Sequence, residues 1–141
     1  MYSKCGILGK FNSTNALFFL IFGNPFALKS VLKEVILKQI VQKMNRLIEV
    51  AIQEKRIIRF KYKGQYRFAE PHVLGKKGDK EQILVFQLSG RSNSGALPQW
   101  RRMNVNEITD LEITKHSFGE KRHLITGNHR GWDEFYQVAQ V

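Results

Sequence analysis

The sequence contains a single cysteine, and this scarcity excludes two common ways of cross-linking a small fold, by a disulfide bond or by a structural zinc ion. Cys5 has no second cysteine with which to form a disulfide bond, and alone it cannot build a structural zinc site. With 141 residues, the chain is long enough to bury a hydrophobic core without such a cross-link. We therefore expect one small domain with a short extension, in a reducing compartment.

Acidic residues are also scarce, with 12 Asp and Glu against 23 Lys and Arg, which gives a net charge of +11. A positive field of this size attracts nucleic acid, an anionic membrane or an acidic ligand, although a basic surface can also serve solubility alone. Residues 1–43 hold six Lys and one Glu, whereas residues 44–141 hold 17 basic and 11 acidic side chains. This break in composition makes Met44 a candidate for the biological start.

No apolar run is long enough for a membrane-spanning helix. Residues 16–22 are apolar, but a Gly-Asn-Pro sequence interrupts them well short of the roughly 20 residues that a span requires. The run resembles the core of a signal peptide, yet no pair of small residues follows at a cleavage position. We expect residues 1–29 to form a poorly ordered extension and the protein to have no transmembrane segment.

Residues 30–55 have the period of an amphipathic helix, with Ser30 as its N-cap and Glu34 in its first turn. A charged outer face over a packed inner face is the favoured interpretation, and a helix lying on an anionic membrane is the alternative. The apolar residues that recur at spacings of three and four are Leu32, Ile36, Ile40, Met44, Leu47, Ile48 and Ala51.

After the helix, the period changes from 3.6 to 2, which is typical of strands. Lys63-Gly64-Gln65 predicts the turn of a hairpin, Pro71 predicts an edge or a bulge, and residues 75–80 predict a second turn. Five short strands within residues 56–114 favour a small β-barrel. The aromatic end of the tail, residues 115–141, is expected to pack on that barrel. The predicted strands are residues 58–62, 66–70, 82–88, 100–105 and 108–113.

The sequence lacks the motifs of the common enzyme classes: there is no G-x-S-x-G, no H-E-x-x-H, no P-loop and no dinucleotide fingerprint. His116, His123 and His129 are spaced seven and six apart, which suits neither helical nor strand ligation, so we interpret them as solvated rather than metal-binding. Asp110 and Glu112 fit a strand surface better than an acid–base pair. We expect a non-enzymatic protein without a metal or other cofactor.

Basic and aromatic residues interleave along the predicted strands and the polar loop between them. Such a surface can hold a phosphate in arginine forks and stack a base on an aromatic ring. An ordinary solvated sheet face is the alternative. The candidate ligand-binding residues are Tyr66, Arg67, His72, Arg91, Trp100 and Arg101.

Four segments carry a family resemblance: residues 47–64, Arg67 four residues before Pro71, residues 82–86 and residues 101–108. Together they resemble a WYL domain, and the resemblance covers residues 45 to about 113. It implies a mainly β fold, in which an SH3-like or Sm-like five-stranded barrel follows an amphipathic α-helix. Such domains occur in prokaryotic regulators and defence-associated proteins, where they are thought to sense a nucleotide or nucleic acid and to control an attached DNA-binding module.

The chain also departs from the family pattern. Of the eponymous Trp-Tyr-Leu only Leu84 is retained, and Glu107 stands where the family has a late arginine, whereas Arg67 and Arg101 match earlier family arginines. The polar loop that ends in Ser92-Asn93-Ser94-Gly95, together with Leu97-Pro98-Gln99-Trp100-Arg101, resembles a stand-alone branch of the family that lacks the usual helix-turn-helix. The single strong helix of this chain supplies no such motif either.

From these patterns we expect a non-enzymatic ligand-sensing or regulatory module of a prokaryotic cytoplasm that binds a nucleotide or single-stranded nucleic acid. The alternative is a structural adaptor that binds a partner protein through the barrel edge or the amphipathic helix. The sequence fixes no oligomeric state.

Overall fold

The computed structural model describes residues 23–91, 95–119 and 130–139. The apolar run 16–22, most of the predicted extension, and His123 and His129 lie outside this part of the chain. Two compact units, Met1–Gln39 and Ile40–Val141, divide the chain, and one helix contributes residues to both. Within the described ranges, no helix combines the length and apolar character needed to cross a bilayer.

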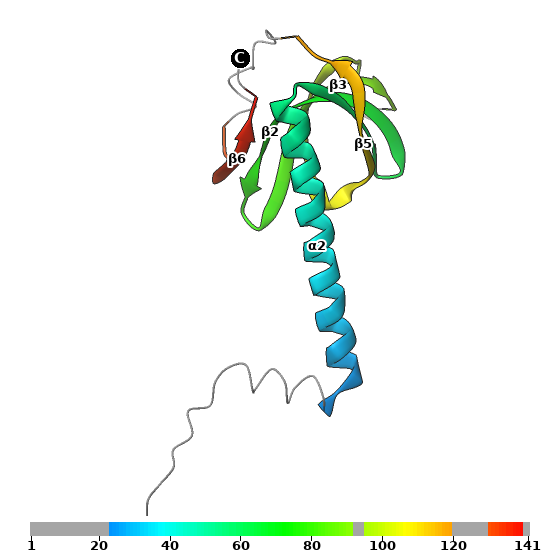
Figure 1. Ribbon diagram of the computed structural model, residues 1–141, viewed down its shortest axis with the longest axis vertical. Coiled ribbons are helices and arrows are strands. Elements are labelled where there is room, and N and C mark those ends of the chain that lie inside the picture. The colour runs from blue at the N-terminus through cyan, green and yellow to red at the C-terminus, as the bar shows by residue number, and fades with distance from the viewer. Residues whose placement is uncertain (1–22, 92–94, 120–129, 140–141) are drawn as a thin grey trace, which may run out of the picture. The chain divides into compact units, whose positions relative to one another are not determined.

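That helix, α2, runs from Pro25 to Gln53 and therefore begins earlier than the pattern at Ser30 predicts (Figure 1). Asn24 is its cap, because the Phe26 backbone N–H donates to the Asn24 side-chain oxygen at 3.0 Å. Proline suits the first helical position, where no intrahelical partner exists for an N–H. The predictions of Ser30 as the N-cap and of Glu34 in the first turn are therefore wrong, since both residues lie further inside the helix.

The buried residues of α2 lie only near its C-terminal end, where Ile48, Ala51 and Ile52 are buried. The helix ends at Gln53, and two residues later Lys55 adopts a left-handed backbone conformation with φ of 51°. The Phe118 backbone N–H then donates to the Lys55 carbonyl at 2.9 Å. This bond ties the end of the helix to Phe118, the residue that directly follows the strand ending at Ser117.

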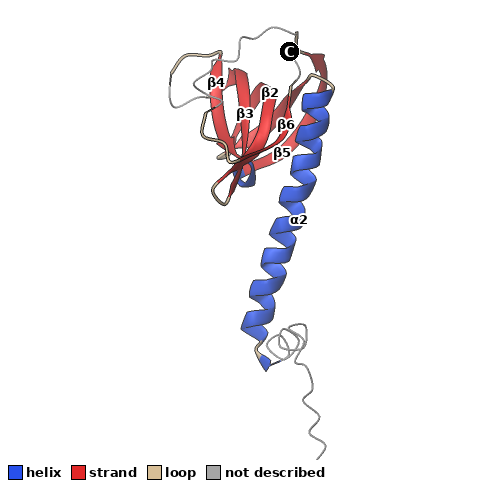
Figure 2. Cartoon of the chain, turned by 90° about the vertical axis from the view of Figure 1, so that its left-hand side faces the viewer, coloured by secondary structure: helices blue, strands red, loops and turns tan. Residues whose placement is uncertain are grey.

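All six strands belong to one antiparallel sheet in which β4, β3, β2, β1 and β5 are neighbours in that order and β6 pairs with β2 (Figure 2). The sheet is not closed, so the prediction of a five-stranded barrel is not confirmed, whereas a mainly β fold with a preceding helix is. The elements are β1 (Arg56–Tyr62), β2 (Gln65–Lys77), β3 (Lys80–Gly90), β4 (Gln99–Asn104), the 3-10 turn η1 (Val105–Glu107), β5 (Ile108–Ser117) and β6 (Glu134–Val138).

The sixth strand exists because β2 is long enough to pair twice along one edge. Residues 65–69 of β2 pair with β1, and residues 73–76 pair with β6. The predicted bulge at Pro71 is confirmed by a register shift against β3 between Pro71 and Val73. However, the strand continues through it to Lys77, which leaves a turn much shorter than the predicted 75–80.

The hydrophobic core of the described residues is formed by the inner face of the sheet and the C-terminal end of α2. Phe60 of β1 is its largest fully buried side chain. It lies in one cluster with Ile48 and Ile52 of the helix and with Ile83 and Val85 of β3. Inward positions alternate along β1 and β3, as the period of 2 predicts. The end of the helix therefore packs on the sheet, which confirms the favoured interpretation of the amphipathic pattern for this part of α2.

For the earlier part of the helix that interpretation is wrong. It places Leu32, Ile36 and Ile40 on a packed inner face, whereas each of these side chains is about half exposed.

The C-terminal strand β6 is held at both ends by backbone bonds to β2. The Asp133 N–H donates to the Lys76 carbonyl at 2.9 Å, and the Ala139 N–H donates to the His72 carbonyl at 2.7 Å. These bonds confirm the prediction that the aromatic end of the tail packs on the sheet. The tail forms a strand there, which the fading sequence pattern did not indicate.

We expect Gly75→Ala to loosen β6 and to destabilise the protein by about 1–3 kcal/mol, the usual cost of overpacking. A Cβ on Gly75 would overlap the carbonyl oxygen of Glu134 and lie 2.8 Å from Cε3 of Trp132. Gly119→Ala is the matched control, because a Cβ there meets no atom within 4 Å. Chemical denaturation measures both variants, and equal stability of the two would contradict tight docking of β6.

Candidate arginine site on the inner face of the sheet

Strand β4 presents two neighbouring site residues to opposite faces of the sheet. Arg101 pairs with Val85, which is fully buried in the core, and Trp100 pairs with Phe86. Cross-strand partners share a face and successive residues alternate. Arg101 therefore lies on the inner face that carries the core, and Trp100 lies on the outer face.

A second arginine joins Arg101 on the inner face. The Arg67 residue of β2 is only 9% exposed, and its Nη1 donates to Oε1 of Gln87 at 2.8 Å. Its guanidinium carbon lies 5.1 Å from the centre of the Tyr62 ring. Gln87 itself is fully buried. We call Arg67, Arg101, Gln87 and Tyr62 the arginine site.

The arginine site concentrates positive charge in a poorly hydrated place. Burial lowers the pKa of the Arg67 guanidinium, and the charge of Arg101 lowers it further, while Tyr62 acts in the opposite direction. Within the described part of the chain, no carboxylate oxygen lies within 4 Å of Arg67. Its buried Nε finds no hydrogen-bond acceptor among the same residues. A buried guanidinium without an acidic partner is costly, and an anionic ligand would relieve that cost.

Glu107 is engaged elsewhere, although it stands where the WYL pattern has an arginine. Its Oε1 accepts a hydrogen bond from Nδ2 of Asn104 at 2.9 Å, and its Oε2 lies 3.4 Å from Nζ of Lys63. The Asn104 hydrogen bond is the largest cause that lowers the pKa of Glu107, and Tyr62 also contributes a hydrogen bond. Glu107 thus reaches the edge of the arginine site through Tyr62 and forms no salt bridge with Arg67.

On the outer face, Trp100 and His72 form an aromatic cluster. The two rings meet edge to face, with centroids 4.8 Å apart, and Phe86 lies 5.3 Å from Trp100. His72 is 3% exposed, and its Nε2 lies 3.5 Å from a carboxylate oxygen of Glu70. These rings pack against one another and form a small cluster that is separate from the main core.

Two other predicted site residues lie apart from both groups. Tyr66 is 44% exposed on the hairpin between β1 and β2, where Nζ of Lys61 lies 4.7 Å and the guanidinium of Arg59 lies 5.0 Å from its ring centre. Arg91 is exposed directly after β3. The structure therefore brings together Arg67 with Arg101 and His72 with Trp100, and it does not gather the six candidates on one surface.

Two members of the arginine site were not among the residues predicted from the sequence. Tyr62 and Gln87 both occupy inward positions of their strands. Tyr62 lies on the same face of β1 as Ile58 and Phe60, and Gln87 lies on the same face of β3 as Ile83 and Val85. A glutamine at an inward position of an otherwise apolar run is a usable signal, because buried polar side chains require partners. That signal was present in residues 82–88.

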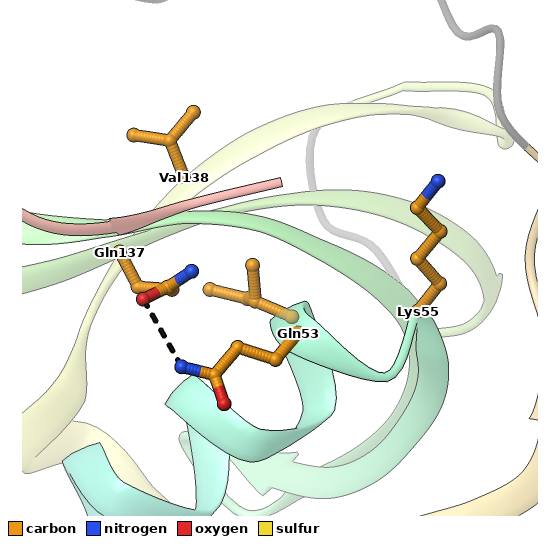
Figure 3. Close-up of a pocket in the computed structure, with 5 residues that line it drawn as sticks. Gln53, Lys55, Gln137 and Val138 are labelled. Carbon is orange, nitrogen blue, oxygen red and sulfur yellow. Dashed lines mark hydrogen bonds between the residues drawn. The ribbon is translucent and has the colours of Figure 1, made fainter. Parts of the chain in front are cut away.

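A pocket of about 360 Å³ lies elsewhere, between the end of α2 and β6 (Figure 3). Nε2 of Gln53 donates to Oε1 of Gln137 at 3.4 Å across it. Its described lining holds one charged side chain, Lys55, and no carboxylate. No cluster of three metal-binding side chains occurs in the described ranges either. The arginine site therefore offers the more specific chemistry.

Comparison of the chain with protein-family models, with curated proteins and with solved structures finds no match.

Proposed function

We propose that this protein is a non-enzymatic regulatory module that binds a phosphate-bearing ligand, a nucleotide or single-stranded nucleic acid, at the arginine site. The observation that carries the proposal is the nearly buried Arg67 guanidinium, which feels the charge of Arg101 on the same face of the sheet and has no carboxylate within salt-bridge distance in the described chain. A phosphate is the ligand group that satisfies two guanidinium forks at once, because each can donate two parallel hydrogen bonds.

The neighbours of Arg67 hold it ready for such a ligand. Gln87 fixes one end of the guanidinium by a hydrogen bond, and the Tyr62 ring lies against it, so few rotamers remain to be ordered on binding. The phosphate contacts are Arg67 and Arg101. Trp100 and His72 are left out of the phosphate contact because their rings lie on the other face of the sheet.

The WYL resemblance supports the same function. A helix followed by β1 to β5 has the element order that the resemblance implies, and the proposed fold is the small SH3-like or Sm-like barrel of that family. Arg67 and Arg101 are also the two arginines that match the family pattern. The module would act in a prokaryotic cytoplasm by passing the presence of its ligand on to a partner.

Arg101→Ala is expected to weaken binding of a mononucleotide or short oligonucleotide by about 5- to 150-fold, the range for one specific arginine contact. It should also reduce the dependence of affinity on salt, since one fewer counterion is released on binding an oligonucleotide. Fluorescence anisotropy at two salt concentrations measures both effects.

Arg102→Ala is the matched control, because it removes the same charge from the next residue on the other face of β4. There Arg102 lies 4.4 Å from the Trp132 ring centre and donates to the carbonyl oxygen of Arg130 at 3.0 Å. Equal losses in the two variants would contradict the arginine site. Affinities of the unaltered protein no tighter than about 0.1 mM for every ligand tried would instead favour the adaptor alternative.

A further inference from the structure

The first part of helix α2 exposes several large apolar side chains. Leu32 is 51% exposed, Val35 46% and Ile36 53%, and Leu28 is exposed as well. All of them belong to the Met1–Gln39 unit. An isolated exposed leucine needs no explanation, but a continuous apolar face on one helix does.

These residues share one side of the helix. At 100° per residue, Leu28, Val31, Leu32, Val35 and Ile36 fall within an arc of about 140°. Lys29 and Lys38 project at the two borders of that arc, about 20° beyond it on either side, and Lys33 follows further round. Phe26 and Leu37 lie outside the arc. From Leu28 to Ile36 the face is therefore apolar with lysines along both margins, and Gln39, which falls inside the same arc, ends it.

The lysines at the margins favour an anionic lipid surface as the binding partner of this face. A long lysine side chain can lay its methylene stem along an apolar surface and raise its ammonium group to anionic headgroups. A helix of this design lies in the plane of a bilayer surface, with its apolar arc among the upper acyl chains. Glu34 is the single acidic residue in the helix before Gln39, so the charge complements an anionic lipid surface.

A second copy of the helix fits the face less well. The spacing of four and three that a coiled coil requires is kept by Leu28, Leu32 and Val35, but Gln39 and Gln42 occupy the next two positions. Two copies would also bring like-charged lysine margins together, with one glutamate each to offset them. Self-association is therefore disfavoured by both pattern and charge.

We propose that this face of α2 binds an anionic lipid surface and holds the protein at the membrane as a peripheral protein. This function is separate from the arginine site and uses none of its residues. Lipid binding depends on the apolar arc for its depth and on the lysines for its selectivity. Vesicle binding should therefore weaken as the salt concentration rises, because salt screens the attraction between the lysines and the anionic headgroups.

Co-sedimentation of the full chain with vesicles tests this proposal. Vesicles of 30% phosphatidylserine in phosphatidylcholine should bind the protein, and pure phosphatidylcholine vesicles should bind it much less. Leu32→Gln should lower the partition coefficient about tenfold, because a large apolar side chain no longer leaves water. Leu37→Gln is the matched control, since Leu37 has the same 51% exposure on the other side of the helix, and its effect should be below twofold.

Three results would overturn the proposal. They are no preference for anionic vesicles, equal effects of Leu32→Gln and Leu37→Gln, or a dimer in sedimentation equilibrium that Leu32→Gln dissociates while vesicle binding is absent. The second result would mean that vesicle binding comes from charge spread over the whole protein surface. The third would mean that the face binds a second copy of the chain.

Two controls accompany these measurements. Thermal denaturation of both variants tests whether the sheet domain remains folded. Binding of mononucleotides to either variant should match that of the unaltered protein, so the failure of one proposal can be told apart from the failure of the other.

Discussion

Ile48→Asp is expected to destabilise the protein by at least about 4 kcal/mol and to leave much of it unfolded at 37 °C. Ile48 is fully buried in the cluster that joins α2 to the sheet. The substitution removes a large apolar side chain and places a carboxylate among the apolar side chains of that cluster, and each of these changes alone costs several kcal/mol. Urea denaturation followed by circular dichroism measures the change in free energy of unfolding.

Val50→Asp is the matched control, two residues further along the same helix and 40% exposed. It introduces the same side chain with the same loss of helix propensity, so it should cost less than about 1 kcal/mol. If Ile48→Asp fails to fold at all, Ile48→Ala gives a measurable value of about 2–5 kcal/mol. A loss below about 1 kcal/mol for Ile48→Asp would mean that the end of the helix does not pack on the sheet.

The double variant Arg67→Met/Gln87→Met should gain about 1–4 kcal/mol in stability while losing all measurable binding of phosphate ligands. It replaces a buried guanidinium and its buried hydrogen-bond partner by apolar side chains of similar length, which commonly stabilises a protein. The pKa of Arg67, which burial lowers, has the direction expected for a charge that the folded state disfavours. A residue that costs stability and is nonetheless present is typical of a binding site.

Arg67→Met alone supplies the comparison for the double variant. It leaves the buried Gln87 side-chain oxygen without its donor, so the single variant should be less stable than the double one by about 1–3 kcal/mol. Chemical denaturation in the absence of ligand resolves the two. A double variant that is less stable than the unaltered protein by more than about 3 kcal/mol would show that Arg67 serves the fold rather than a ligand.

Local patterns in the sequence predicted the local parts of the fold. Alternation on either side of Lys63-Gly64 predicted the β1–β2 hairpin, and the register Ile58 to Ala69 confirms it. The start of α2 was misplaced because the Asn24 cap and Pro25 lie next to an apolar run that does not itself indicate a helix start. Strand β6 was missed because it pairs with β2 across some 60 residues of chain, and such pairing leaves no local period.

The candidate site was predicted only in part, for a related reason. Grouping Arg101 with Trp100, and Arg67 with Tyr66, joined neighbours in sequence, although alternation along a strand places neighbours on opposite faces. Applying that rule to β2 and to β4 would have separated the two pairs from sequence alone. The electrostatic coupling of Arg67 with Arg101 could not be foreseen in this way, because it depends on the register of β2, β3 and β4 and on the bulges in β2.

Titration of the ¹⁵N-labelled full chain with a mononucleotide, observed at the Nε–Hε resonances of its arginines, tests anion binding at the arginine site most directly. Resonances are assigned with Arg67→Met and Arg101→Ala. We predict saturable shifts of the Arg67 and Arg101 signals with one common dissociation constant, and no comparable shift at Arg102, whose side chain lies on the other face of the sheet. Unchanged Arg67 and Arg101 signals at millimolar nucleotide, or shifts of equal size at all arginines, would contradict it.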